Sequence, residues 1–226
     1  MLNKPVGYVS NLPSRDEVEA CDLITRVNAH GSRHERSEAG ESWDAAMRDA
    51  HRLNVCGRLD KDSRGLLILT EDGVLAKAII GGNAVPKTYE VEVDRRVTDR
   101  HLDALNGPVS LDGEPLLPME VTRLSPQVLK FVLREGKNRQ IRRLCGALDL
   151  GVVDLVRVSV GGCHLKDLPE GCWRLMSEEE RSMLRSFAGG REVRDRGSEG
   201  GRGGSMGSAR AKGWQRKSYG GGRIRG

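Results

Sequence analysis

Hydrophobic and polar positions alternate most clearly over Lys87–Val93, where the apolar side chains fall on every second residue. A period of two predicts a β-strand with one buried face. Two apolar stretches, Met119–Leu124 and Val128–Leu133, are joined by three turn-forming residues and predict a β-hairpin. Shorter apolar runs predict three more strands, at Leu2–Ser10, Leu66–Thr70 and Val152–Val160.

Apolar positions three or four residues apart predict helices elsewhere in the chain. Val18, Cys21, Ile24 and Val27 have this spacing, and the polar residues before them have capping-box spacing. We therefore expect a helix over Ser14–Ala29. Further helices are predicted at Ser42–His51, Val74–Ile80, Thr98–Asn106, Asn138–Leu148 and Ser177–Phe187.

The order of these elements indicates the fold class. Strands come in neighbouring pairs as well as alternating with helices, which favours an α+β fold with a largely antiparallel sheet over a doubly wound parallel one. A chain of 226 residues can hold one domain of ordinary size and an appendage. We place the folded domain at residues 1–188 and a tail at residues 189–226.

The tail carries the excess positive charge of the chain. Residues 189–226 contain ten Lys or Arg against three Asp or Glu, whereas residues 1–188 contain 27 against 29. The tail is rich in Gly, Arg and Ser, has little to bury and is predicted to be disordered. Trp214 and Tyr219 beside its cations suit weak binding of single-stranded RNA, although a purely solubilising extension explains the composition equally well.

The cysteines and apolar runs exclude several classes of protein. The five cysteines are scattered without a CxxC pair, and the five histidines do not have zinc-ligand spacing beside them. We expect reduced, mostly buried cysteines in an intracellular protein without a structural metal. The longest apolar runs, such as Leu66–Leu69, are far too short to span a membrane, and no membrane partner is expected.

The segment Gly57–Gly73 places Asp60 in a short charged loop that leads into an apolar strand. A carboxylate there lies close to a rigid scaffold without being buried in it, as a group that must meet a substrate requires. A surface turn with solvated acidic side chains explains the same pattern. The loop alone leaves both interpretations open.

Three further segments, Leu2–Gly7, Lys87–Tyr89 and Arg134–Cys145, accompany Gly57–Gly73 along the chain. Together the four resemble the motifs of the RNA pseudouridine synthases, and most closely the branch that modifies single sites in ribosomal RNA. The resemblance implies a fold around a central antiparallel sheet, with the active site in a cleft across it. It also implies isomerisation of uridine to pseudouridine, which needs no cofactor and no metal.

By this resemblance Asp60 is the nucleophile, and the sequence leaves open which carbon it attacks. Arg142 matches the arginine that pairs with this carboxylate. Tyr89 matches the tyrosine that stacks on the target uracil and takes part in the final proton removal. Each has a plainer alternative: Arg142 as a solvated charge on a helix, and Tyr89 as an aromatic side chain on the core face of a strand.

The resemblance also implies a set of RNA-binding residues. Arg58 matches the residue that fills the space left by an extruded uridine or grips the RNA backbone. Ile141 would close the base pocket or serve only the core, Lys87 would neutralise a phosphate, and Asn138 and Gln140 belong to the same binding motif. Cations in Gly57–Gly73 and Arg134–Cys145 predict a phosphate-binding patch, although runs of charged residues are usually only solvated surface. They are Lys61, Arg64, Lys137, Arg139 and Arg143.

Relatives of this branch usually carry a small N-terminal RNA-binding domain, for which this sequence has no room before the first motif. Either the tail substitutes for that domain, or the sequence lacks its true start and with it an organellar targeting segment. We expect a monomer in the cytoplasm or an organelle, with ribosomal RNA as substrate and transfer RNA as the alternative. The rival hypothesis is a non-catalytic RNA-binding or ribosome-assembly factor on the same fold.

Overall fold

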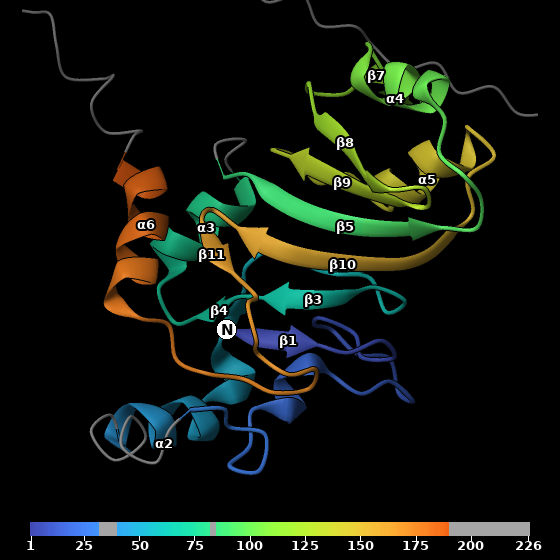
Figure 1. The fold of residues 1–226 in the computed structure, drawn as a ribbon. Coiled ribbons are helices and arrows are strands. Elements are labelled where there is room, and N and C mark those ends of the chain that lie inside the picture. Colours follow the sequence, from blue (N-terminus) through green and yellow to red (C-terminus); the bar gives the residue numbers. More distant parts are fainter. Residues whose placement is uncertain (32–39, 82–84, 190–226) are drawn as a thin grey trace, which may run out of the picture.

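The computed structural model describes residues 1–31, 40–81 and 85–189, which surround one central sheet (Figure 1). The strand order is β1 (Leu2–Lys4), β3 (Arg64–Leu67), β10 (Val152–Val160), β5 (Lys87–Val93), β9 (Val128–Leu133) and β8 (Glu120–Ser125). A short strand, β11 (Cys163–His164), pairs with β10. Every pairing in this sheet is antiparallel except that of β3 with β10, which is parallel. The predicted α+β class with a mainly antiparallel sheet is confirmed.

The alternating pattern of β5 determines which of its faces is buried. Its apolar residues are buried, and Glu90 and Glu92 between them are exposed. β9 alternates in the same way, and its Phe131 lies opposite Tyr89 in the antiparallel register. The two strands therefore present one apolar face to a common core, as the period of two in the sequence predicts.

Helices lie at both ends of the sheet, as Figure 1 shows. They are α2 (Gly40–Arg48), α3 (Gly73–Gly81), α4 (Asp99–Asn106), α5 (Gln140–Gly146) and α6 (Glu178–Gly189). Each corresponds to a predicted helix within a few residues. The predicted capping box before α6 is confirmed, because Ser177 and Glu180 each accept a hydrogen bond from the other's backbone N–H.

Short elements complete the described part of the chain. β2 (Asn54–Val55) pairs with β4 (Leu69–Thr70), and β6 (Ser110–Leu111) pairs with β7 (Glu114–Pro115). A 3-10 turn, η2 (Ala50–Arg52), follows α2. The predicted strand at Leu66–Thr70 is therefore divided, because its first half joins the central sheet as β3 and its second half pairs with β2 as β4.

The predicted helix over Ser14–Ala29 is wrong. Only one 3-10 turn, η1 (Ala20–Leu23), forms there. Val9 donates its backbone N–H to the carbonyl of Val18 at 3.0 Å, so this segment pairs with the chain that follows β1 instead of bonding within a helix. Val27 remains 93% exposed, so the apolar spacing does not mark one buried face. Tertiary pairing overrides the local period here.

A later segment closes the edge of the sheet at β1. Asn3 donates its backbone N–H to Cys172 at 2.9 Å, and Gly171 donates to Asn3 at 2.8 Å. Trp173, which is 2% exposed, packs against Trp43 of α2, with the ring centroids 4.6 Å apart and the ring planes tilted by 49°. Residues more than 160 positions apart in the sequence thus lie side by side.

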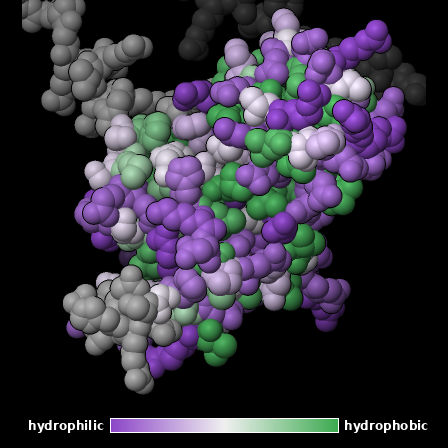
Figure 2. Space-filling view, in the orientation of Figure 1, coloured by the Kyte–Doolittle hydropathy of each residue, from purple (hydrophilic) through white to green (hydrophobic). Residues whose placement is uncertain are grey.

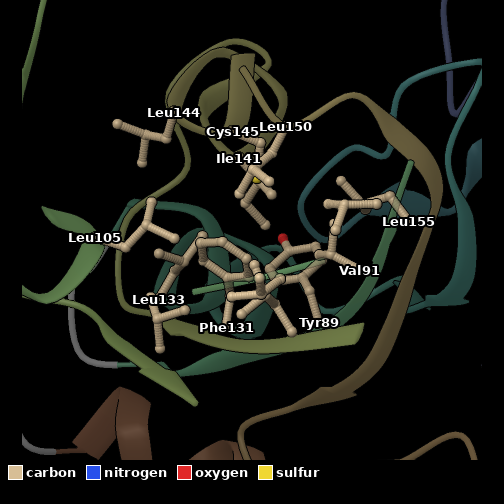
Figure 3. Close-up of a cluster of buried hydrophobic side chains, with 14 of the residues drawn as sticks. Tyr89, Val91, Leu105, Phe131, Leu133, Ile141, Leu144, Cys145, Leu150 and Leu155 are labelled. Atoms are coloured by element: carbon tan, nitrogen blue, oxygen red, sulfur yellow. The ribbon is translucent and has the colours of Figure 1, made fainter. Parts of the chain in front are cut away.

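In the part of the chain that the structure describes, buried apolar side chains form three clusters. One lies between β5, β9 and α5 and contains Tyr89, Phe131 and Ile141 (Figure 3). The second lies beneath α3 and α6, and the third joins β1, η1 and α2 to Trp173. Figure 2 shows that hydrophilic residues cover most of the visible surface, with hydrophobic ones gathered over the middle of the sheet.

Two predictions concern residues outside the described ranges: the disorder of residues 190–226 and most of the polar loop before α2. No helix within the described ranges is long and apolar enough to cross a membrane.

Candidate active site

A cavity of about 420 Å³ lies between the loop that precedes β3, the first half of β5 and the N-terminal end of α5. Its lining contains ten of the thirteen residues to which the sequence assigned a catalytic or binding role. They are Arg58, Asp60, Lys87, Tyr89, Lys137, Asn138, Arg139, Gln140, Ile141 and Arg142. Three sequence motifs therefore converge on one cavity. Lys61, Arg64 and Arg143 are not part of its lining.

Asp60 occupies a loop whose backbone is held on both sides. Leu59 before it is 6% exposed and exchanges two hydrogen bonds with the hydroxyl of Ser10, at 2.7 and 2.9 Å. Ser63 after it is 2% exposed and donates its backbone N–H to the Asp60 carbonyl at 3.1 Å. The side chain of Asp60 itself is 38% exposed. The loop thus presents a carboxylate to the cavity from a fixed backbone.

Arg157 of β10 holds this loop against the sheet. Its side chain is buried, with 1% of the residue exposed, and its guanidinium donates to three backbone carbonyls. The acceptors are Leu66 at 2.8 Å, Gly57 at 2.9 Å and Arg58 at 3.4 Å. These bonds satisfy a charge that would otherwise be costly to bury, and they tie the loop to the sheet.

Gly65 explains how β10 approaches this loop so closely. It has φ +108°, and a Cβ at this position would lie 2.5 Å from the Arg157 carbonyl oxygen. Gly65 and Arg157 are partners in the parallel pairing of β3 with β10. Only glycine permits this backbone conformation and this contact together.

The ion pair of Asp60 among the described residues is with Arg139, whose Nη1 lies 3.7 Å from Oδ2. The predicted pair of Asp60 with Arg142 is not formed. Arg142 donates instead to the backbone carbonyl of Asp62 at 2.6 Å, and its Nε lies 3.4 Å from the Asp62 carboxylate without hydrogen-bond geometry. Arg139 precedes α5 in a left-handed conformation and reaches Asp60 from there.

Asp62 links the two arginines and was not singled out from the sequence. It accepts two hydrogen bonds from Arg139, at 2.8 and 3.0 Å, in a planar fork. That contact, together with the charges of Arg139 and Arg142, holds the pKa of Asp62 below its ordinary value. A carboxylate two residues after Asp60 thus fixes both cations at the cavity mouth.

Tyr89 of β5 and Ile141 of α5 contribute apolar walls to the cavity. Tyr89 is 9% exposed and Ile141 is 5% exposed, and both line the cavity. Both also belong to the apolar cluster with Phe131, as Figure 3 shows. The two interpretations considered for each residue are therefore compatible, because one side chain contributes to the core and to the cavity wall.

Lys87 lies on the floor of the cavity and is 6% exposed. Its ammonium group donates to the Val85 carbonyl at 3.3 Å. Burial, and after it the charge of Arg157, lowers the pKa of Lys87 to about 8. Lys87 is thus a cation whose charge is poorly compensated and readily lost.

The predicted phosphate-binding patch is largely neutralised in the structure. Lys61 pairs with Glu17 at 3.1 Å, Arg64 pairs with Asp154 at 2.6 Å, and Arg143 pairs with Asp112. Lys137 and Arg58 are exposed at the cavity, and no carboxylate within the described ranges lies within ion-pair distance of either. Lys137 of the patch and the neighbouring Arg58 are therefore the cations best placed for an incoming polyanion.

Gln140 has a structural contact that its predicted binding role did not anticipate. Its side chain accepts from the backbone N–H of Lys137 at 3.0 Å and donates to Glu135 at 3.2 Å. The residue is 3% exposed and orders the turn before α5. Asn138 lies in that turn, exposed, at the cavity.

Arg157 and Asp62 are the residues that sequence reasoning missed. Arg157 has a signal in the sequence, because a single arginine interrupts the apolar positions of a predicted strand. A charge at a buried strand position indicates a buried partner. Asp62 has no comparable signal, since it is one of several charges in a loop.

Comparisons with known proteins identify the family of this chain. A family model described as RNA pseudouridylate synthase matches residues 1–147. The dual-specificity RNA pseudouridine synthase RluF of Salmonella typhi is 33% identical over 180 residues, which are 79% of this chain and 54% of that protein. The chain thus spans about half the length of the first curated relatives that it matches.

In two other comparisons, this chain matches a larger share of the related protein. Ribosomal large subunit pseudouridine synthase E of Xanthomonas axonopodis pv. citri is 38% identical over 188 residues, which are 74% of this chain and 88% of that protein. A crystal structure of a pseudouridylate synthase has a TM-score of 0.66 and 27% identity, over 81% of this chain and 71% of that chain. This structural match confirms the fold that the motifs imply.

Proposed function

Because this chain belongs to the RNA pseudouridylate synthase family, we propose that it isomerises a uridine of RNA to pseudouridine, with Asp60 as the nucleophile. One observation carries the proposal: Asp60, Tyr89 and Arg139, from three separate segments, line a single cavity. Its volume of about 420 Å³ is within the range of small-molecule sites and suits one nucleoside.

The reaction requires little beyond a nucleophile and a polarised pocket. The C1′–N1 bond breaks, the uracil turns while it stays in the pocket, and a C1′–C5 bond forms. The proton on C5 then leaves, and N1 gains one. The Asp60 carboxylate attacks the sugar or the base to start this sequence. The Tyr89 ring supports the uracil, and its hydroxyl or water takes the C5 proton.

Positive charge around the cavity stabilises the negative charge that uracil gains as its bond to the sugar breaks. Lys87 and the guanidinium of Arg157 supply this positive charge from the floor, and Arg139 supplies it from the mouth. Fixed cations in a partly desolvated site stabilise developing charge without reorganisation. Arg142 acts through Asp62, whose backbone it holds, and is therefore a positioning residue in this proposal.

The uridine reaches Asp60 only after it has left the RNA stack. Arg58, exposed at the cavity, is placed to occupy the space it leaves, and Lys137 to hold a phosphate. We further propose ribosomal RNA as the substrate. The name of ribosomal large subunit pseudouridine synthase E, which is 38% identical to this chain, supports that choice, and transfer RNA is the alternative.

The test is release of tritium from RNA labelled at C5 of uridine, because C5 loses its hydrogen only when pseudouridine forms. Wild type, Asp60→Asn and the matched control Asp44→Asn are each incubated with total ribosomal RNA and, separately, with transfer RNA. Asp44 is a suitable control because its exposed carboxylate pairs only with an exposed Arg26 in the described structure.

Release by wild type and by Asp44→Asn, but not by Asp60→Asn, is the expected result. Release from ribosomal RNA alone would support the proposed substrate, and release from transfer RNA alone would replace it. If wild type binds RNA and releases no tritium from either, the chain is a non-catalytic RNA-binding factor on this fold. Release by Asp60→Asn at the wild-type rate would show that Asp60 is not the nucleophile.

A further inference from the structure

A second group of chemically reactive side chains lies outside the cavity, where η1 meets η2. The Sγ of Cys21 lies 3.1 Å from Nδ1 of His51, and Oε2 of Glu19 lies 3.8 Å from the same nitrogen. The three ligand atoms all lie within 4.8 Å of one another. None of these residues lines the cavity.

We propose that Glu19, Cys21 and His51 bind a zinc ion through one oxygen, one sulfur and one nitrogen atom. Tetrahedral zinc with bonds of about 2.0–2.3 Å places its ligand atoms roughly 3.3–3.6 Å apart. The Cys21–His51 and His51–Glu19 distances, 3.1 and 3.8 Å, lie on either side of that spacing. Changes of a few tenths of an ångström bring these two pairs to the spacing of zinc ligands, and the Cys21 and Glu19 ligand atoms lie within 4.8 Å of each other.

Asp22 adds the outer contact that a histidine ligand normally has. Its Oδ1 lies 3.5 Å from Nε2 of His51, the ring nitrogen that faces away from Cys21. Its Oδ2 accepts a hydrogen bond from the backbone N–H of Glu19 at 3.0 Å, which holds the carboxylate in place. A carboxylate on Nε2–H selects the tautomer in which Nδ1 is free to bind a metal.

The proposed zinc site has one buried ligand, one exposed ligand and negative charge beside them. Cys21 is 4% exposed, whereas the side chain of His51 is 68% exposed. The carboxylates of Glu19 and Asp22, both close to His51, favour a divalent cation, which displaces the thiol proton of Cys21 on binding. The exposed side of the site leaves a fourth position for water.

The position of the site indicates what the ion would do. Glu19 and Cys21 lie on one side of a segment of about thirty residues, and His51 closes it on the other side. η2 leads through β2 directly into the loop that carries Asp60. Zinc at this point would tie together the segment where the helix prediction fails. The role proposed is structural and does not depend on the reaction at Asp60.

Cobalt(II) is the probe, because a thiolate bound to it gives a charge-transfer band in the near ultraviolet that oxygen and nitrogen ligands do not give. The metal-free full chain is titrated with cobalt as wild type, Cys21→Ser and His51→Gln. Cys172→Ser is the matched control, since Cys172 is partly exposed and belongs to another cluster. The band should saturate at one equivalent in wild type and Cys172→Ser, and zinc should abolish it.

Cys21→Ser and His51→Gln should both lose the band. His51→Gln guards against misfolding of the buried Cys21 variant, because its side chain is largely exposed. Asp22→Asn should keep the band and weaken cobalt binding by about 10–100-fold. Zinc should raise the melting temperature of wild type but not of His51→Gln. No band in wild type, or a band that survives Cys21→Ser, would overturn the proposal.

Discussion

The floor and the mouth of the cavity hold positive charge in two different ways. On the floor, Arg157 and Lys87 are almost fully buried, and their polar hydrogens meet backbone carbonyls. At the mouth, the side chain of Arg139 is 43% exposed and forms a fork with the Asp62 carboxylate. Backbone carbonyls of the sheet and its loops therefore hold the floor cations, whereas the carboxylates of Asp62 and Asp60 hold the mouth cation.

This difference separates stability from substrate binding. Buried cations without a carboxylate partner are costly to create and costly to disturb. Exposed ion pairs contribute little to stability because water and salt screen them, but they can exchange one anion for another. We expect changes on the floor to alter folding and its pH dependence, and changes at the mouth to alter the handling of RNA.

The largest effect should come from Arg157→Leu. Its removal leaves the carbonyls of Leu66 and Gly57 without their donor in a buried place, which should lower the free energy of unfolding by about 3 kcal/mol or more. Arg139→Leu should lower it by less than about 1 kcal/mol. Urea denaturation of both variants measures the contrast, and equal losses would erase the distinction between floor and mouth.

Lys87→Met should change the pH dependence of stability. The pKa of Lys87 is about 8 in the folded chain against an ordinary value of 10.5. The unfolded chain binds more protons between these values, so wild-type stability should gain about 2–3 kcal/mol as the pH rises through that window. Lys87→Met should lack this gain. Lys4, whose pKa also falls to about 8, is present in both proteins and cancels in the difference.

Urea denaturation at several pH values across the window gives the difference curve. Lys77→Met, on the exposed face of α3, is the matched control and should follow wild type. A difference curve that is flat with pH would show that Lys87 keeps its charge in the folded chain. It would contradict the expectation that the buried cations of the floor control the pH dependence of stability.

Asp62→Asn should act at the mouth without much effect on folding. Without the carboxylate, Arg139 loses its fork and the Arg142 side chain loses its neighbouring charge. We expect the single-turnover rate of tritium release to fall about tenfold, with RNA affinity changed less than about twofold. Asp62→Glu should restore part of the rate. A loss of affinity equal to the loss of rate would instead make Asp62 part of the RNA-binding surface.

The smallest effect should come from Lys137→Gln. If Lys137 contacts one phosphate, its loss should reduce the slope of log affinity against log salt by about one unit or slightly less. Lys61→Gln is the matched control, because Lys61 is already paired with Glu17 at 3.1 Å and should change the slope less. Filter binding at several salt concentrations measures both, and equal slopes for the two variants would argue against a special position for Lys137.

The sequence was informative where one local pattern decides the structure. The period of two in Lys87–Val93 defines both a strand and its buried face, and the motifs around Asp60 and Arg139 lead to one cavity. The resemblance predicted Arg142 as the partner of Asp60, whereas the structure pairs Asp60 with Arg139. Arg139 and Arg142 are one helical turn apart, and the left-handed conformation of Arg139 determines which of them reaches the carboxylate.

The sequence failed where distant segments decide the structure. The helical spacing that begins at Val18 predicts a helix, but this segment bonds to Val9, and the backbone carbonyl of Asn28 accepts from Trp173. Cys21 and His51 lie thirty residues apart in the sequence, and no local pattern signals that their side chains approach to 3.1 Å. Tertiary contacts of this kind leave no local period to read.

The pairing of β1 with residues 171–174 has a consequence for how the chain folds. Asn3 can bond to Cys172, and Leu2 can lie beside Trp173, only after almost the whole domain has been synthesised. On a ribosome the outer edge of β1 would therefore wait, unpaired, while the rest of the sheet assembles. Contacts of such long sequence separation slow folding and prolong the exposure of a sheet edge to other chains. The last step of folding would be the docking of Trp173, and its rate would determine how long the newly made protein needs protection.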